Sequence, residues 1–292
     1  MDRSVYKKIR QIEIRSRKAV NDLFAGAYRS VFKGQGLEFH EVREYNPGDD
    51  IRMIDWNVSA RLGSPYVKKF IEERQQSLIL AVDVSASQDF GSVKLSKNET
   101  AAEIAAVLAF SAIKNNDLVG LLMFSDKIEK YIPPKKGKRH VLRVIREILS
   151  FKRESKKTDM ASALRYLNRV NKKSAIVLVI SDFLANDFQK PIRVLSKRHD
   201  VIPIVIKDPF EKELPALSLV NFEDPETGQV YQVDLNDNQL TKAYQDQKYQ
   251  ETQQLQKFFR SLKIDHLELG TDGEYAVPLT RFFKIREKRI RH

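Results

Sequence analysis

The chain has 292 residues, enough for one large domain or two smaller ones with a sizeable core. Its 51 Lys and Arg against 39 Asp and Glu give a formal net charge of +12, and 42% of the residues are hydrophobic. This composition is typical of a globular protein and excludes collagen, mucin and coiled-coil classes. The absence of cysteine excludes a disulfide framework, a thiolate zinc site, an iron–sulfur cluster and a cysteine nucleophile, and it favours a reducing compartment.

The positive charge is concentrated at the two ends of the chain. Residues 1–20 hold seven basic and two acidic side chains, and residues 281–292 hold six basic and one acidic. A basic patch made of both termini would give weak, salt-sensitive contact with polyanions such as nucleic acid or anionic lipid. A pair of solvated helices is the alternative explanation, because charge runs usually form solvated surfaces.

The sequence gives no sign of a membrane span or of a secretory signal. The most apolar stretches, 104–113 and 175–180, are shorter than the roughly 18 residues that a span needs. The first 20 residues lack the apolar central region of a secretory signal. We therefore expect a cytoplasmic protein without a transmembrane segment.

The first 75 residues predict a helix followed by a small β-containing extension. Apolar residues recur at helical spacing among Lys and Arg from Ser4 to Phe24. Residues 33–37 break that pattern, and Glu38 to Tyr45 then alternates as a strand does before a turn at 46–49. Alternation returns from Tyr66 to Arg74 and predicts a second strand.

From residue 76 the pattern changes to alternating strands and helices. Strands are expected at 78–82, 118–124, 175–180 and 201–206, with an antiparallel neighbour at 127–132 linked onward through Pro133 and Pro134; helices are expected at 96–114, 138–150, 159–170 and 187–198. Strands that are apolar on both faces belong in a mostly parallel sheet covered by helices on two sides. The expected fold class is therefore α/β with a doubly wound, mostly parallel sheet.

The C-terminal part predicts an insertion, a polar helix, a last strand and a basic helix. Residues 207–236 indicate a loop and hairpin, 237–262 a surface helix, 264–269 a strand and 275–290 a helix. The expected organisation is an N-terminal region at 1–75, a domain at 76–272 that carries the insertion, and a basic C-terminal helix at 273–292.

Polar residues follow two of the predicted strands and precede one predicted helix. In an open parallel sheet, ligands bind beyond the carboxyl ends of the strands. Asp83, Ser85 and Ser87 follow the first strand, Asp182 follows the strand at 175–180, and Thr158 lies at or near a helix N-cap. Together they would form an all-oxygen cluster with two carboxylates, which suits Mg²⁺ first and Mn²⁺ second.

A purely structural explanation exists for the same residues. Asp83 or Ser85 would cap a helix and Asp182 would start a turn, as these residue types often do. The joint appearance of all three segments, each at the end of a strand or helix, favours the metal site.

The pattern Asp83-x-Ser85-x-Ser87, then Thr158, then Asp182 resembles the metal-ion-dependent adhesion site of von Willebrand factor A domains. The resemblance implies a doubly wound sheet with one short antiparallel edge strand. It also implies that the serines bind the ion directly, that Thr158 and Asp182 bind it directly or through water, and that an acidic side chain of a partner completes the shell.

The front of the chain resembles the hallmark of the bacterial domain-of-unknown-function family fifty-eight. The matching segments are GLEFHEVREY at 36–45, PGDDIR at 47–52, IDW at 54–56 and SAR at 59–61, with RHD at 198–200, DPFE at 208–211 and ETG at 226–228. The resemblance implies association with a MoxR-type AAA+ ATPase and a chaperone-like role in assembly or metal insertion for client proteins.

The charged residues of the hallmark, residues 36–61, leave two roles open. Their interleaved arginines and carboxylates would form an ion-pair network that holds the extension to the larger domain, or they would form a recognition surface. The short spacing in sequence favours the network.

The expected function is a non-enzymatic interaction module that presents a divalent cation to a partner carboxylate. An Mg²⁺-dependent phosphohydrolase with Asp83 as nucleophile is the enzyme alternative, but it requires a second carboxylate where Ser85 stands. A polyanion-binding protein that uses the basic termini is the third possibility.

Overall fold

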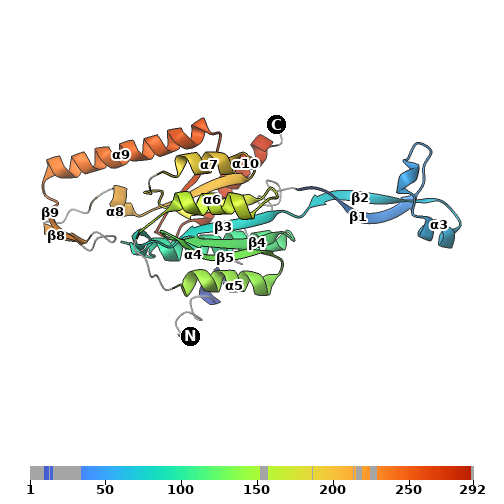
Figure 1. Cartoon of the computed structure of the whole chain (residues 1–292), viewed down its shortest axis with the longest axis horizontal. Coiled ribbons are helices and arrows are strands. Elements are labelled where there is room, and N and C mark those ends of the chain that lie inside the picture. The colour runs from blue at the N-terminus through green and yellow to red at the C-terminus, as the bar shows by residue number, and fades with distance from the viewer. Residues whose placement is uncertain are drawn as a thin grey trace. The chain divides into compact units, whose positions relative to one another are not determined.

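The computed structural model describes residues 10–12, 14–15, 34–151, 157–185, 187–212, 214, 219–223 and 229–290. Two compact units make up the chain (Figure 1). Residues 32–76 form the smaller one, called here the ribbon unit, and the remaining residues form the sheet unit. The predicted helix at 4–24 lies mostly outside the described residues; the described positions within it, 10–12 and 14–15, are helical.

The ribbon unit is a long antiparallel hairpin. Strand β1 (Gly34–Glu44) pairs with β2 (Tyr66–Arg74), and β2 has the predicted bounds. Strand β1 begins at Gly34, four residues before the predicted start at Glu38, and already pairs with β2 there. A shift in register between Gly34 and Leu37 accommodates the glycine-rich segment, since irregular pairing tolerates glycine better than a regular ladder does.

The two strands are joined by residues 45–65, which we call the tip. The tip contains the 3₁₀ helix η2 (Ile51–Met53) and the helix α3 (Trp56–Leu62), neither of which the sequence pattern predicts. Asp55 caps α3 by accepting the backbone N–H groups of Asn57 and Val58. The helix ends at Gly63, whose positive φ of 76° is a conformation that glycine adopts without strain.

The sheet unit contains a six-stranded sheet in the order β10-β7-β6-β3-β4-β5. Renumbered along the chain, this is the order 6-5-4-1-2-3 of doubly wound folds, and all pairs are parallel except β4 with β5. The predicted fold class is confirmed, including the antiparallel edge strand that the resemblance implies. The strands are β3 (Ser77–Asp83), β4 (Leu118–Phe124), β5 (Ile128–Lys135), β6 (Ile176–Ser181), β7 (Asp200–Lys207) and β10 (Leu267–Gly270).

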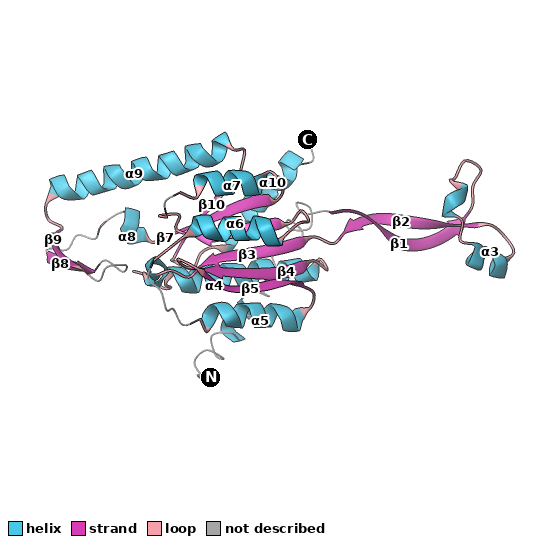
Figure 2. Cartoon of the chain, viewed as in Figure 1, coloured by secondary structure: helices cyan, strands magenta, loops and turns pink. Residues whose placement is uncertain are grey.

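Helices cover both faces of this sheet (Figure 2). On one face, α6 (Met160–Val170) and α7 (Gln189–Ser196) pack on inward side chains such as Ile79 and Val177. On the other face lie α4 (Lys97–Lys114) and α5 (Lys138–Leu149). The alanine-rich α4 buries most of its length, which matches its apolar composition on every side.

Strand β5 corrects the expectation that Pro133 and Pro134 link a strand to a helix. Both prolines lie within β5, which runs to Lys135 at the edge of the sheet. An edge position tolerates proline because the missing N–H is not required by a neighbouring strand. Gly120 on β4 makes room for the ring, since a Cβ at that position would lie 3.0 Å from Pro134 Cγ.

The C-terminal segments follow the predicted order. Residues 207–236 contain the short helix α8 (Pro209–Lys212) and an antiparallel hairpin of β8 (Leu219–Glu223) and β9 (Val230–Asp234). Helix α9 (Asn238–Ser261) follows, then β10, which begins three residues later than expected. The last element is helix α10 (Ala276–Ile290).

Helix α9 is held to the sheet unit by side chains of its C-terminal half. Phe259 is its fully buried side chain, and its ring meets that of Phe183 edge to face with 5.5 Å between centroids. The other described side chains of α9 are exposed or half-buried. Phe258 packs on Phe188, and Gln256 donates a hydrogen bond to Glu268 of β10. The C-terminal half of α9 therefore anchors the helix, with Phe259 as its fully buried contact.

We predict that Phe259→Ala lowers the free energy of unfolding by about 3–5 kcal/mol, because the large buried ring leaves a cavity. Tyr249→Ala, an exposed aromatic on the same helix, should change it by less than about 0.5 kcal/mol. Urea unfolding followed by circular dichroism measures both. Equal losses for the two variants would show that Phe259 does not anchor α9.

Candidate metal site at the carboxyl edge of the sheet

The candidate site lies where the strand order reverses. Strands β3 and β6 are parallel neighbours. After β3 the next strand, β4, is added on one side of this pair, and after β6 the next strand, β7, is added on the other. Asp83 is the last residue of β3, and Asp182 directly follows the last residue of β6. The topology therefore places both predicted carboxylates at the position where doubly wound folds bind ligands.

Asp83 is a buried carboxylate that accepts two hydrogen bonds. Its Oδ1 accepts the N–H of Ser85 at 2.9 Å, and its Oδ2 accepts the hydroxyl of Ser181 at 2.7 Å. Burial and the negative charge of Asp182 raise the pKa of Asp83 to about 6. Among the described residues, no cationic side chain pairs with Asp83.

The two serines lie directly beyond Asp83. Ser85 is buried and precedes the 3₁₀ helix η3 (Ala86–Asp89), but its side chain makes no capping hydrogen bond. Its Oγ lies 3.2 Å from Ser87 Oγ, and Gln88 Nε2 donates to Ser87 at 3.4 Å. The capping role that a structural explanation assigned to Ser85 is therefore absent, whereas Asp83 does make a local turn contact.

Asp182 is paired with a buried lysine that it shares with Glu211. Lys97 is 1% exposed, and its Nζ lies 3.1 Å from Asp182 Oδ2 and also donates to Glu211. Burial alone would lower the pKa of Lys97, but the charges of Asp182 and Glu211 outweigh it and raise that pKa. Asp182 Oδ1 additionally accepts the N–H of Leu184 at 3.2 Å, a local turn contact of the kind expected structurally.

Thr158 lies at the same edge, directly before the N-cap of α6, and is not part of the hydrogen bonds described above for the other four residues. The N-cap of α6 is its neighbour Asp159, which accepts the N–H and the hydroxyl of Ser162. The N–H of Asp159 donates to the carbonyl of Ser125, just beyond β4, at 2.7 Å. In the described part of the chain, no hydrogen bond joins Thr158 to Asp83, Ser85, Ser87 or Asp182.

The side-chain oxygens of Asp83, Ser85 and Ser87 are of the kind that suits a hard divalent cation. All donor atoms are oxygens, and the spacing of the two serine hydroxyls is close to the roughly 3 Å between neighbouring oxygens of an octahedral Mg²⁺ shell. Asp83 brings a buried negative charge without a cationic partner in the described residues. Beside Ser87, the buried Oε1 of Gln88 also finds no donor in the described structure.

The DPFE segment at 208–211 is fixed by hydrogen bonds between Asp208 and two other parts of the chain. Asp208 accepts the N–H of Ser92 at 2.8 Å and the hydroxyl of Thr271 at 2.7 Å. Burial would raise the pKa of Asp208, but these hydrogen bonds outweigh it and lower that pKa. The segment thereby fixes Glu211 against Lys97, a role that the sequence alone did not reveal.

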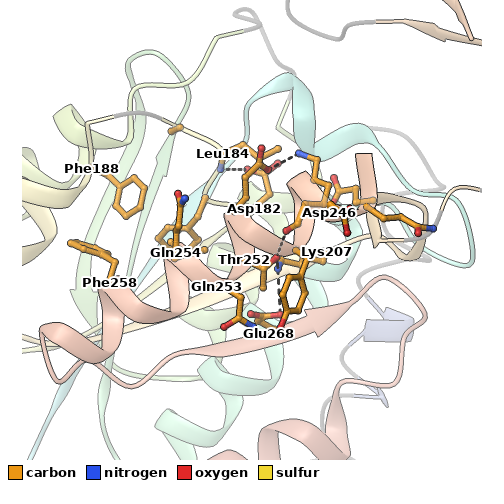
Figure 3. Close-up of a pocket in the computed structure, with 18 of the residues that line it drawn as sticks. Asp182, Leu184, Phe188, Lys207, Asp246, Thr252, Gln253, Gln254, Phe258 and Glu268 are labelled. Atoms are coloured by element: carbon orange, nitrogen blue, oxygen red, sulfur yellow. Dashed lines mark hydrogen bonds and ion pairs between the residues drawn. The ribbon is translucent and has the colours of Figure 1, made fainter. Parts of the chain in front are cut away.

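A cavity of about 1120 Å³ opens next to Asp182, between the loop after β6 and helix α9 (Figure 3). Phe188 and Phe258 form an apolar wall, and their rings meet edge to face at 5.8 Å. Lys207 and Glu268 form a polar wall, 3.4 Å apart. A segment of another protein that reached Asp182 would find room here.

Two basic side chains of the C-terminal helix α10 form ion pairs with other parts of the sheet unit. Arg286 pairs with Asp200 and lies 3.7 Å from Asp265, and Arg289 also pairs with Asp265. These ion pairs reduce the charge that α10 offers to a polyanion. Among the described residues, no helix is long and apolar enough to cross a membrane.

The chain is similar to two bacterial relatives of uncharacterised role. It is 28% identical over 283 residues to the uncharacterized protein Rv1480 of Mycobacterium tuberculosis. This match covers 96% of this chain and 89% of that protein. It is 29% identical over 107 residues to the uncharacterized protein YeaD of Bacillus subtilis, a match that covers 37% of this chain and 25% of YeaD.

The chain also matches two solved structures and one family model. The BatB protein of Bacteroides thetaiotaomicron matches 73% of this chain and 99% of its own with 15% identity and a TM-score of 0.47. The SpRpn10 VWA domain matches 46% of this chain and 76% of its own with 12% identity and a TM-score of 0.34. The family model DUF58, described as a protein of unknown function, matches residues 41–254, and the chain therefore belongs to the DUF58 family.

Proposed function

We propose that this protein is a non-enzymatic interaction module that binds Mg²⁺, or Mn²⁺, through Asp83, Ser85, Ser87, Thr158 and Asp182. It captures an acidic side chain of a client protein and works in the cytoplasm with a MoxR-type AAA+ ATPase in protein assembly or maturation. The observation that carries the proposal is Asp83. It is a buried carboxylate at the topological switch point whose charge no described side chain neutralises.

Each residue of the site has a separate part in the proposal. The carboxylate of Asp83 supplies the charge that draws a cation, and the hydrogen bonds from Ser85 and Ser181 hold that carboxylate in place. The hydroxyls of Ser85 and Ser87 supply neutral oxygen ligands. When bound, a divalent cation supplies a positive centre to which a partner carboxylate attaches. The cavity beside Asp182 accommodates the residues that flank it.

Lys97 sets the charge of the site. Its ammonium group offsets one of the two negative charges of Asp182 and Glu211, whereas Asp83 has no cationic partner among the described residues and attracts a cation most strongly. A site with less negative charge binds a cation less tightly and leaves it able to attract a partner carboxylate.

A hydrolytic role is not supported by the residues around Asp83. A phosphohydrolase that used Asp83 as nucleophile would require a carboxylic acid two residues later to move a proton to the leaving group. Ser85 occupies that position, and its hydroxyl lies against Ser87. Mg²⁺-stimulated hydrolysis of phosphate esters that depends on Asp83 would contradict the proposal.

We predict that Asp83→Asn abolishes binding of Mg²⁺ and Mn²⁺ while leaving the protein folded. The amide keeps an oxygen for the N–H of Ser85 but removes the charge that attracts the cation. In chelator its melting temperature should equal or exceed that of the wild type, because the repulsion with Asp182 is gone. Titration calorimetry and thermal melts measure both quantities.

Asp234→Asn is the matched control, because it makes the same chemical change at an exposed aspartate whose Oδ1 also accepts the N–H two residues later, and it should bind metal as the wild type does. If wild type and Asp83→Asn bind metal equally, the site assignment is wrong. If Asp83→Asn unfolds in chelator while the wild type does not, Asp83 is a structural residue.

We predict that Lys97→Met lowers the free energy of unfolding in chelator by about 3–5 kcal/mol, because Asp182 is left buried without its cation. Mg²⁺ should raise the melting temperature of this variant more than that of the wild type, since the site gains negative charge. An equal response to Mg²⁺ in both proteins would show that Lys97 does not influence the metal site.

The partnership predicts a pattern in affinity purification. A tagged chain purified from its own cells in Mg²⁺ should retain a MoxR-type AAA+ ATPase together with client proteins. The clients should be lost in chelator and with Asp83→Asn, because their capture requires the cation. Mass spectrometry of the retained proteins gives the result. Clients that stay bound under all three conditions would contradict carboxylate capture.

A further inference from the structure

The tip of the ribbon unit, residues 45–65, exposes large apolar side chains that have no place in a core. Trp56 is 68% exposed, Ile51 65% and Leu62 58%, and neither η2 nor α3 buries a residue. Within the side chains described for this unit, Val67 is the buried apolar one. A two-stranded ribbon has a single layer and cannot bury such residues by itself.

The carboxylates of the tip are engaged in contacts within the ribbon unit. Asp49 accepts two hydrogen bonds from the guanidinium of Arg43, at 2.8 and 2.7 Å, which lower the pKa of Asp49. Asp50 accepts the N–H of Arg52 as the cap of η2. Asp55 caps α3 and lies 3.5 Å from Lys68. The hallmark aspartates therefore hold the tip in its conformation.

The two arginines of the tip are available for other contacts. Arg52 and Arg61 are exposed, and the described structure gives neither guanidinium an ion pair or a hydrogen bond. A guanidinium presents several N–H donors in a plane and pairs with carboxylates through two parallel hydrogen bonds. The tip thus combines exposed apolar side chains with unengaged donors suited to carboxylates.

We infer that the tip is a docking surface for a partner protein that presents carboxylates among apolar side chains. Trp, Met and Arg are enriched in the cores of protein interfaces, and Trp and Arg often contribute most of the binding energy. Trp56, Met53, Arg52 and Arg61 lie on this one segment. The tip has about 20 residues, the number that one side of a standard interface contains. Figure 2 shows that α3 lies at the end of the ribbon formed by β1 and β2.

This inference goes beyond the metal site, because the tip belongs to the other unit and its contacts require no cation. Of the two roles left open for the hallmark segment, the inference assigns recognition to Trp56, Arg52 and Arg61. Asp49 and Asp55 pair with Arg43 and Lys68 of the ribbon unit itself, so these ion pairs hold the tip rather than forming the predicted network to the larger domain.

Trp56 makes the inference directly testable, because it is the only tryptophan of the chain. Its fluorescence is measured in the full-length protein during titration with a 16-residue synthetic peptide of Leu, Phe and Glu at helical spacing. We expect a saturable shift of the emission to shorter wavelength and weaker quenching by acrylamide, both unchanged by chelator. A matched peptide with Lys in place of each Glu should have no effect.

Two double variants separate the tip from general surface charge. Arg52→Glu with Arg61→Glu should weaken binding of the acidic peptide at least tenfold. Arg193→Glu with Arg281→Glu, the same change at exposed arginines of α7 and α10, should leave it unchanged. Equal weakening by both pairs would overturn the inference, as would equal binding of the two peptides or no response up to millimolar peptide.

Other occupants of the tip give different results in the same assay. Emission that is already at short wavelength and protected from acrylamide at nanomolar protein would mean that the chain itself covers Trp56. A shift that depends on protein concentration would indicate a second copy. A shift with phosphatidylglycerol vesicles but not with the acidic peptide would indicate a membrane surface. Each of these three results would overturn the inference.

Discussion

Lys97 carries a positive charge into the interior at the first position of α4, where the helix dipole disfavours a cation. Such a charge is tolerated only when carboxylates compensate for the loss of water. Asp182 after β6 and Glu211 in α8 provide this compensation, so one ammonium group joins three segments of the carboxyl edge. Asp208 fixes the segment of Glu211 in turn. Asp83 lies outside these ion pairs, and its described partners are the N–H of Ser85 and the hydroxyl of Ser181.

The fold was predictable where a single period governs a long segment. The apolar runs of the central strands and the alanine-rich pattern of α4 give the sheet, its parallel pairing and its helical cover, because burial on both faces leaves a strong signal. Short elements were missed. Helix α3 spans 7 residues, too few to show a period, yet Asp55 before it and Gly63 after it are the capping residues that mark a helix.

The residues of the candidate site were also predictable only in part. Asp83, Ser85 and Ser87 are close in sequence and follow a clear strand, so a local pattern was enough to predict that they lie together at the end of β3. Lys97 and Glu211 are 114 residues apart, and each resembles an ordinary surface residue until the fold brings them together. Ser181 escaped notice because its hydroxyl points to Asp83, 98 positions earlier in the chain. Pairs of this kind become visible only in three dimensions.

The two prolines of β5 limit how other proteins can approach the sheet. An exposed edge strand normally offers a row of N–H and C=O groups to which a foreign strand can add. Pro133 and Pro134 have no N–H to offer, and because successive residues of a strand direct their backbone groups to opposite sides, one of the two removes a donor from the outer row of β5. Strand addition from another chain, and the fibrous assembly that it would seed, is therefore disfavoured along this stretch. At this edge, recognition is left to side chains, whose chemistry is selective, rather than to the backbone, whose hydrogen bonds any extended chain can share.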